Sequence, residues 1–202
     1  MISGIIFGLS GGFTPGPLMT LVISETLRHG LREGLKIAMV PVISDFPIVL
    51  CSLLILSHLT EAEIMLGILA LAGAAYLIHL GWESMRFKGK TPENEDAKPQ
   101  SFKKGIITNF LNPNPYMFWI TVGAPTVLRA YDINLFSAIL FILSMYFCLV
   151  GSKVLTAVIT GKSRNFLKSR GYVLTIRGLG VLLILFALIF VDQGLAALGI
   201  FK

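Results

Sequence analysis

A carboxylate and two proline-broken motifs are the residues of this chain best placed to do chemistry. Asp45 stands inside an apolar block of the sequence. Thr14-Pro15-Gly16-Pro17 interrupts an earlier apolar block, and Asn112-Pro113-Asn114-Pro115 repeats the pattern about a hundred residues later. Paired breaks in corresponding apolar segments are typical of transporter binding sites.

The two breaks predict the starts of new helices inside the membrane. Thr14 and Asn112 are good N-cap residues, and Pro15 and Pro113 suit the first helical position. The free amides and the positive dipole end of such a half-helix attract an anion or a carboxylate. The alternative is that these prolines only kink helices for packing. The predicted substrate-binding residues are Thr14, Pro15, Gly16, Pro17, Asp45, Asn112, Pro113, Asn114 and Pro115.

Asp45 is the sharpest single candidate, because a carboxylate in mid-membrane costs about 2.5–3.5 kcal/mol even on a lenient insertion scale. It must therefore face a cavity, pair with a cation or be protonated. A cavity would let it receive a substrate ammonium group or take up a proton, which makes it the candidate for proton coupling. Lys153 is the one plausible intramembrane ion-pair partner, although its side chain could instead reach the membrane surface.

The composition predicts that these residues sit in a membrane. Hydrophobic residues make up 54% of the 202 residues and charged residues only 14%, against roughly 25% charged in soluble domains. The net charge of +6 does not indicate a nucleic-acid partner, because the basic residues lie between the apolar blocks. We therefore expect a lipid bilayer as the surroundings of the chain.

Six apolar blocks are long enough to cross a bilayer, which needs about 20 residues each. They cover residues 2–24, 35–58, 62–85, 105–128, 134–160 and 172–198. The first carries Gly4, Gly8, Gly12 and Gly16 on one face, a spacing that lets another helix approach closely. The sequence predicts an all-α integral membrane protein with six transmembrane helices, of which helices 1 and 4 are broken near the midplane.

The two motifs indicate an internal repeat. Aligning Pro15 with Pro113 gives an offset of 98 residues, and Met19 then meets Met117. Each half holds three spans, and because three is odd the second copy enters the membrane in the opposite direction. We expect a first repeat over 1–86, a cytoplasmic linker over 87–103 and a second repeat over 104–202, together forming one membrane domain with two inverted three-helix repeats.

The basic residues predict the orientation. Fourteen of the 17 Lys and Arg residues lie in the first, third and fifth connections. By the positive-inside rule these connections are cytoplasmic, so both termini are predicted to lie outside the cytoplasmic (inner) membrane. The N-terminal block carries no positive residue before Arg28 and is interpreted as a first span and not as a cleaved signal peptide.

Several motifs quoted above also resemble a known family, the LysE-type translocators. The resemblance rests on Gly-Gly-Phe-Thr-Pro-Gly-Pro-Leu-Met over 11–19, Ser-Asp at 44–45, Tyr-Leu-x-x-Leu-Gly-Trp over 76–82 and Asn-Phe-Leu-Asn-Pro-Asn-Pro over 109–115. It implies proton-driven export of amino acids or similar small zwitterions by six-helix subunits that could form a homodimer. Residue by residue, it implicates Pro15, Gly16, Pro17, Asp45, Asn112, Pro113 and Pro115.

The chain departs from the family pattern at two places. Family members often have glycines just before the acid of the second span, where this chain has Pro41 and Ser44. The motif of the fourth span is often Asn-Pro-Lys, and Asn114 removes that positive charge here. These departures concern the identity of the solute and not the fold.

Two other functions compete with amino-acid export. A transporter of the same shape could carry an inorganic or metal cation, but the spans lack the several carboxylates or histidines of a divalent-cation site. A membrane redox carrier would use Cys51 and Cys148, yet neither stands beside an activating charge or in a cysteine motif. No hydrolase or nucleotide-binding motif is present, so we expect neither an enzyme nor a cofactor nor a bound metal.

Overall fold

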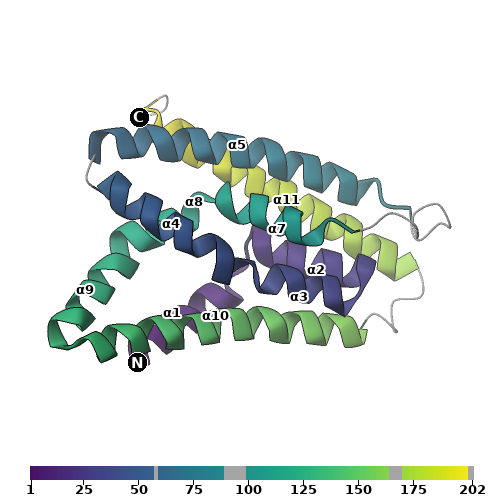
Figure 1. The fold of residues 1–202 in the computed structure, drawn as a ribbon. Helices are drawn as coiled ribbons and strands as arrows, with labels where there is room; N and C mark the ends of the chain where they lie inside the picture. Colours follow the sequence, from purple (N-terminus) through teal and green to yellow (C-terminus); the bar gives the residue numbers. More distant parts are fainter. Residues whose placement is uncertain (57–58, 89–98, 164–169, 200–202) are drawn as a thin grey trace.

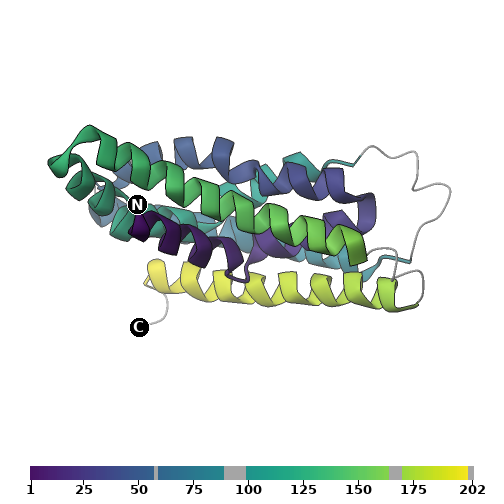
Figure 2. The same ribbon diagram turned by 90° about the horizontal axis from the view of Figure 1, so that it is seen from below.

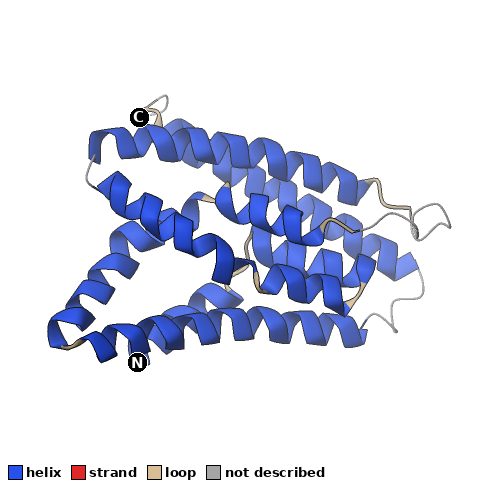
Figure 3. Cartoon of the chain, viewed as in Figure 1, coloured by secondary structure: helices blue, strands red, loops and turns tan. Residues whose placement is uncertain are grey.

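The computed structural model describes residues 1–56, 59–88, 99–163 and 170–199, and within these ranges the regular structure is entirely helical (Figure 3). The elements of the first half are α1 (Ile2–Phe13), α2 (Pro17–His29), α3 (Leu31–Ala38), α4 (Val40–Leu56) and α5 (Leu59–Met85). The second half holds α7 (Ser101–Phe110), α8 (Pro113–Phe118), the π-helix η1 (Trp119–Gly123), α9 (Ala124–Ile133), α10 (Leu135–Ser163) and α11 (Arg170–Ala197). Of the predicted linker 87–103, residues 89–98 lie outside the described ranges, and α7 begins inside its last part.

Each of the six predicted blocks coincides with helical structure, but not every block is one straight helix. Four segments are long and apolar enough to cross a membrane: Leu31–Ser52, Glu63–Met85, Leu135–Ser163 and Gly171–Ala197. The pair α1 and α2 passes the same test as a single span bent by 59°. The predicted fourth span is divided among α7, α8, η1 and α9, so the described residues hold four to five candidate spans and the count of six stays a prediction.

Two long helix pairs form the sides of the bundle (Figure 1). α5 packs along α11, where the backbones of Gly81 and Gly180 meet, and α1 packs along α10. α4 contacts α7, α8 and η1 in the interior of the bundle. Figure 2, from below, shows α1 running beside α10 while α11 lies apart from them.

The predicted glycine face of the first block makes the contact between α1 and α10. Gly4, Gly8 and Gly12 are buried in α1. A Cβ atom at Gly4 would meet Ser144 Oγ and one at Gly8 the carbonyl oxygen of Met145, so side chains there would force the helices apart. Gly16 lies beyond the end of α1 and does not share this contact. The predicted glycine face is therefore confirmed for Gly4, Gly8 and Gly12.

The connections that carry most of the basic residues share one end of the molecule. The α2–α3 turn, the end of α5 with the start of α7, and the end of α10 with the start of α11 all lie at the right of Figure 1. The start of α1 and the end of α11 lie at the opposite end. The structure thus places the predicted cytoplasmic connections on one side; which side faces the cytoplasm stays a prediction.

A cluster of charged side chains joins three helices at this basic end. Glu83 on α5 accepts hydrogen bonds from Arg28 Nη1 on α2 (2.9 Å) and from Lys104 Nζ on α7 (2.9 Å). Glu25 on α2 is 1% exposed, accepts a hydrogen bond from Ser101 Oγ on α7 (2.5 Å) and lies 3.5 Å from Lys104 Nζ. The cluster, which we call the ionic cluster, links the two halves of the chain.

An apolar core lies next to the ionic cluster. On α2 it includes Leu21 and Val22, one turn before Glu25, and on α5 it includes Leu77 and Leu80, just before Glu83. All four side chains are at most 3% exposed. Apolar packing and paired charges therefore close the basic end of the bundle.

Candidate functional site

At the first helix break, Thr14 is the C-cap of α1 and Gly16 is the N-cap of α2, with Pro15 between them. Thr14 follows the last residue of α1, and both its amide (2.9 Å) and its hydroxyl (2.5 Å) donate to the Ser10 carbonyl. Pro15 has no N–H with which to continue that ladder. α2 then begins at Pro17 with Gly16 as its N-cap, so the prediction of Thr14 as the N-cap and Pro15 as the first helical residue is wrong. The extended backbone of Gly16 moves the new helix start by two residues.

The N-terminus of α2 is uncapped. No side chain of the described residues accepts a hydrogen bond from it, and the first bond back to the break is the one from the Thr20 amide to the Gly16 carbonyl (2.9 Å). The amides of Gly16, Leu18 and Met19 therefore remain free donors within the described structure. Free amides at the start of a 13-residue helix carry a partial positive charge.

The second break follows the prediction in its geometry but not in its electrostatics. Asn112 is the N-cap of α8 and Pro113 its first residue, as predicted. The Asn112 Oδ1 accepts a hydrogen bond from the Asn114 amide (3.0 Å), and Pro113 and Pro115 have no N–H to offer. Because its first turn keeps no free backbone amide, this terminus lacks the backbone donors found at the start of α2, and the predicted symmetry of two such termini is not found.

Asp45 is held on two sides inside the protein. It is 7% exposed and lies on α4. Its Oδ1 accepts a hydrogen bond from Asn109 Nδ2 on α7 (2.8 Å), and its Oδ2 accepts one from the Tyr146 hydroxyl on α10 (3.2 Å). Asn109 Nδ2 also donates to Ser44 Oγ (2.6 Å), which fixes the amide plane. Two helices of the second half therefore position a carboxylate that the first half carries.

Lys153 is buried in the same region and is not paired with Asp45. Its side chain is 5% exposed on α10. The Nζ donates one long hydrogen bond, to the Gly12 carbonyl at the end of α1 (3.4 Å). Among the described residues no carboxylate lies within ion-pair distance (4.0 Å) of this ammonium group. The ion pair with Asp45, which the sequence left open, is therefore absent from this conformation, although both residues line one cavity.

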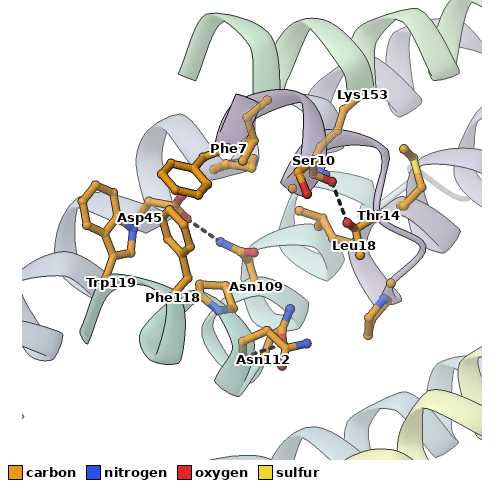
Figure 4. A pocket seen from close by; sticks show the side chains of 18 of the residues that line it. Phe7, Ser10, Thr14, Leu18, Asp45, Asn109, Asn112, Phe118, Trp119 and Lys153 are labelled. Carbon is orange, nitrogen blue, oxygen red and sulfur yellow. Dashed lines mark hydrogen bonds between the residues drawn. The ribbon is translucent and has the colours of Figure 1, made fainter. Parts of the chain in front are cut away.

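A cavity of about 340 Å³ brings the predicted site residues together (Figure 4). Its walls include both helix breaks, Asp45 and Lys153. Of the predicted residues, the following line it: Thr14, Pro15, Gly16, Pro17, Asp45, Asn112, Asn114, Pro115 and Lys153. Pro113 is buried beside the cavity without lining it. Residues that are separated by about a hundred positions in the sequence thus line one cavity.

Other residues of this cavity escaped the sequence prediction. Asn109 stands within the quoted motif of the fourth block, and its polar side chain in an apolar segment was the available signal. Phe7, Phe118 and Trp119 gather near Asp45, with Phe7 and Phe118 edge to face at 6.0 Å between ring centroids. Aromatic residues are too common in apolar blocks to be singled out from one sequence. Tyr146 is found only through its hydrogen bond.

An apolar helical protein whose interrupted helices surround a partly open cavity has the arrangement of a membrane transporter. The chain belongs to the LysE type translocator family, whose model matches residues 9–194. The residues at which this chain departs from the family motifs, Pro41, Ser44 and Asn114, all belong to the site region. Pro41 and Asn114 line the cavity, and Ser44 accepts a hydrogen bond from Asn109.

Three bacterial proteins illustrate the relatives. The uncharacterized membrane protein YahN of Escherichia coli K12 is 26% identical over 122 residues, which are 57% of this chain and 55% of YahN. The chemotactic transduction protein ChpE of Pseudomonas aeruginosa is 32% identical over 131 residues (61% of this chain, 63% of ChpE). The cysteine/O-acetylserine efflux protein of Escherichia coli K12 is 29% identical over 127 residues (60% and 63%). The matches thus span 55–63% of the relatives' own length, and no solved structure matches significantly.

Proposed function

We propose that this protein is a secondary exporter of amino acids or similar small zwitterions across the cytoplasmic membrane. The observation that carries the proposal is the shared cavity, which joins a buried anion, a buried cation and both helix breaks. A zwitterion presents both opposite charges to such a chamber. One relative is named a cysteine/O-acetylserine efflux protein, which supports amino-acid efflux as the direction and class of transport.

The proposed architecture is a pair of inverted repeats, 1–86 and 104–202, that rock around this cavity. The pairing of α1 with α10 corresponds, under such a repeat, to the pairing of α7 with α4. The contact of α5 with α11 would then lie on the pseudo-two-fold axis. We place both termini outside and the ionic cluster at the cytoplasmic end, on the evidence of the basic connections. A homodimer stays a prediction.

We assign Asp45 two linked tasks, receiving the ammonium group and carrying a proton. Both oxygens already accept hydrogen bonds, so the carboxylate is oriented before a solute arrives. Occupation by an ammonium group or by a proton would each neutralise a charge that is costly to leave buried. Competition between proton and solute for one carboxylate is sufficient to couple export to a proton gradient.

A cation transporter of the same shape is a weaker proposal. Asp45 is the only acidic residue among those that line the cavity, and Lys153 adds a positive charge to the same walls. A redox carrier has less support, because Cys51 and Cys148 are free cysteines and neither belongs to the cavity lining.

The test of the proposed function is Asp45→Asn in proteoliposomes loaded with radiolabelled amino acids. Asparagine keeps the shape and both hydrogen bonds: its oxygen can accept from Asn109, and its amide can donate to the Tyr146 hydroxyl oxygen. Folding should therefore survive while gradient-driven efflux is lost. Asp132→Asn, at an exposed position on α9, is the matched control and should transport normally.

The result also separates the two tasks of Asp45. If the variant still exchanges internal for external solute without a gradient, Asp45 carries only the proton. If exchange is lost as well, Asp45 also binds the solute. Gradient-driven efflux at the normal rate would remove Asp45 from the mechanism, and absence of amino-acid efflux by the unaltered protein would remove the proposed function itself.

A further inference from the structure

The cavity is lined by two oppositely charged side chains, Asp45 and Lys153, that form no ion pair with each other. Asp45 and Lys153 are 7% and 5% exposed, and no ion pair joins these two described side chains. The carboxylate accepts two hydrogen bonds at 2.8 and 3.2 Å, whereas the ammonium group, with three hydrogens, donates one bond of 3.4 Å. The lysine is thus the less satisfied of the two charges, and a buried cation with spare donors calls for an anion.

Residues with free amides at the start of α2 also line this cavity. The cavity lining includes Gly16, Leu18 and Met19, whose amides are free in the described structure. Figure 4 shows Lys153 reaching down toward the end of α1 beside Ser10 and Thr14, next to the break from which α2 starts. Amides at a helix start and a nearby ammonium group offer hydrogen bonds and positive charge to the same small anion.

The other helix start that borders the cavity offers no free backbone amide. In the first turn of α8, the Asn114 amide donates to the Asn112 side chain, and Pro113 and Pro115 have no N–H to donate. The two breaks therefore differ in their free backbone amides although they resemble each other in sequence. A bound zwitterion would thus meet different surroundings at the two breaks.

We propose that Lys153 and the N-terminus of α2 form a carboxylate subsite, and that the solute must carry a free carboxylate group. The carboxylate accepts from the Lys153 ammonium group and from the amides of the α2 start, while the ammonium group of the solute lies toward Asp45. The inference rests on the proposed function, because it names the class of solute that the exporter accepts. It adds that a solute with only the ammonium half of an amino acid is rejected.

The test compares amino acids with the amines that lack only the carboxylate. The protein is purified in lipid nanodiscs, and binding is measured by isothermal titration calorimetry for three pairs: L-cysteine and cysteamine, L-serine and ethanolamine, L-leucine and isoamylamine. We expect the amino acid to bind about tenfold or more tighter than its amine, because charge-assisted hydrogen bonds in a buried site contribute at least this factor.

Variants locate the subsite. Lys153→Met removes the charge and keeps the length of the side chain. It should reduce the difference within each pair to the part that the α2 amides supply, whereas Lys153→Arg should keep the full difference. Asp45→Asn should weaken binding of the amino acid and of the amine alike. Lys162→Met, at an exposed position near the end of α10, is the control and should behave as the unaltered protein.

Each outcome decides one of the two proposals. Equal affinity for amino acid and amine in the unaltered protein overturns the carboxylate subsite and leaves the export function standing. An undiminished difference in folded Lys153→Met overturns the role of Lys153. Should Lys153→Met fail to fold, the ligand pairs on the unaltered protein still decide. Failure of every amino acid to bind overturns the proposed function, and the subsite with it.

Discussion

Glu83 holds the ionic cluster together, and Glu83→Gln is expected to loosen the basic end of the bundle. Its Oε1 accepts charge-assisted hydrogen bonds from Arg28 and Lys104, both at 2.9 Å, so it joins α5 to α2 and to α7. Glutamine has nearly the same shape and can still accept one weaker bond. The substitution therefore removes the charge at the centre of the cluster without creating a cavity.

The size of the effect follows from the exposure of this carboxylate. Glu83 is 39% exposed, so solvent screens its ion pairs, and each contributes about 0.5–1 kcal/mol. Loss of two such pairs weakens the contact among the three helices by about 1–2 kcal/mol. If these contacts exist only while the basic end is closed, the population that is open at this end rises by a factor of about 5–30.

The open population can be measured through a cysteine in the apolar core. Leu21→Cys, at a position that is 2% exposed, is placed in a chain whose native cysteines are serine, and labelling by a maleimide is followed over time. Glu83→Gln should accelerate labelling about 5- to 30-fold, and the acceleration should shrink at high salt, which already screens these pairs in the parent chain. Glu63→Gln, exposed on the same helix, is the control.

Labelling rates that agree within about twofold between the parent chain and Glu83→Gln would refute this reasoning. The same conclusion would follow if Glu63→Gln accelerated labelling as much as Glu83→Gln. Either result would mean that the apolar core alone keeps this end closed.

Two further variants, one single and one double, test the packing and the cysteines. Gly8→Ala should lower the free energy of unfolding by about 1–3 kcal/mol, since the added methyl group meets the Met145 carbonyl of α10; thermal unfolding in detergent checks this against Gly151→Ala, where the added Cβ meets nothing within 4 Å. Cys51→Ser combined with Cys148→Ser should leave amino-acid efflux from proteoliposomes unchanged, because neither thiol lines the cavity; loss of efflux in the folded double variant would favour the redox alternative.

The sequence carried much of the fold because apolar length and helix-breaking residues act locally. The six apolar blocks, the glycine face of α1 and the break at Asn112 could all be predicted from residue types and spacing. The start of α2 could not be placed, because Thr14 bonds back to Ser10 and closes α1 instead of opening α2. Both outcomes are available to a threonine, and the extended Gly16 decides between them.

The partners within the site depend on contacts between distant segments. Asp45 and Lys153 were visible as charges in apolar blocks, but their separate attachments, to Asn109 and Tyr146 in one case and to Gly12 in the other, needed the packed helices. The unequal helix starts were also hidden. Two similar proline motifs predict equal termini. Only the conformation shows that the Asn112 side chain accepts the hydrogen bond of the Asn114 amide in its own helix start.

The glycine contact between α1 and α10 also bears on how the cavity can deform. Because the backbones of these two helices are in contact, the helices have little room to slide. Lys153 on α10 and Gly12 on α1 would therefore move together. Asp45 and Asn109 belong to α4 and α7, and the 3.2 Å bond from Tyr146 joins that carboxylate to α10. Under the proposed function, a solute that contacts both charges would connect Asp45 on α4 with Lys153 on α10. The length of the solute, from its ammonium group to its carboxylate, would then set the distance between these two side chains.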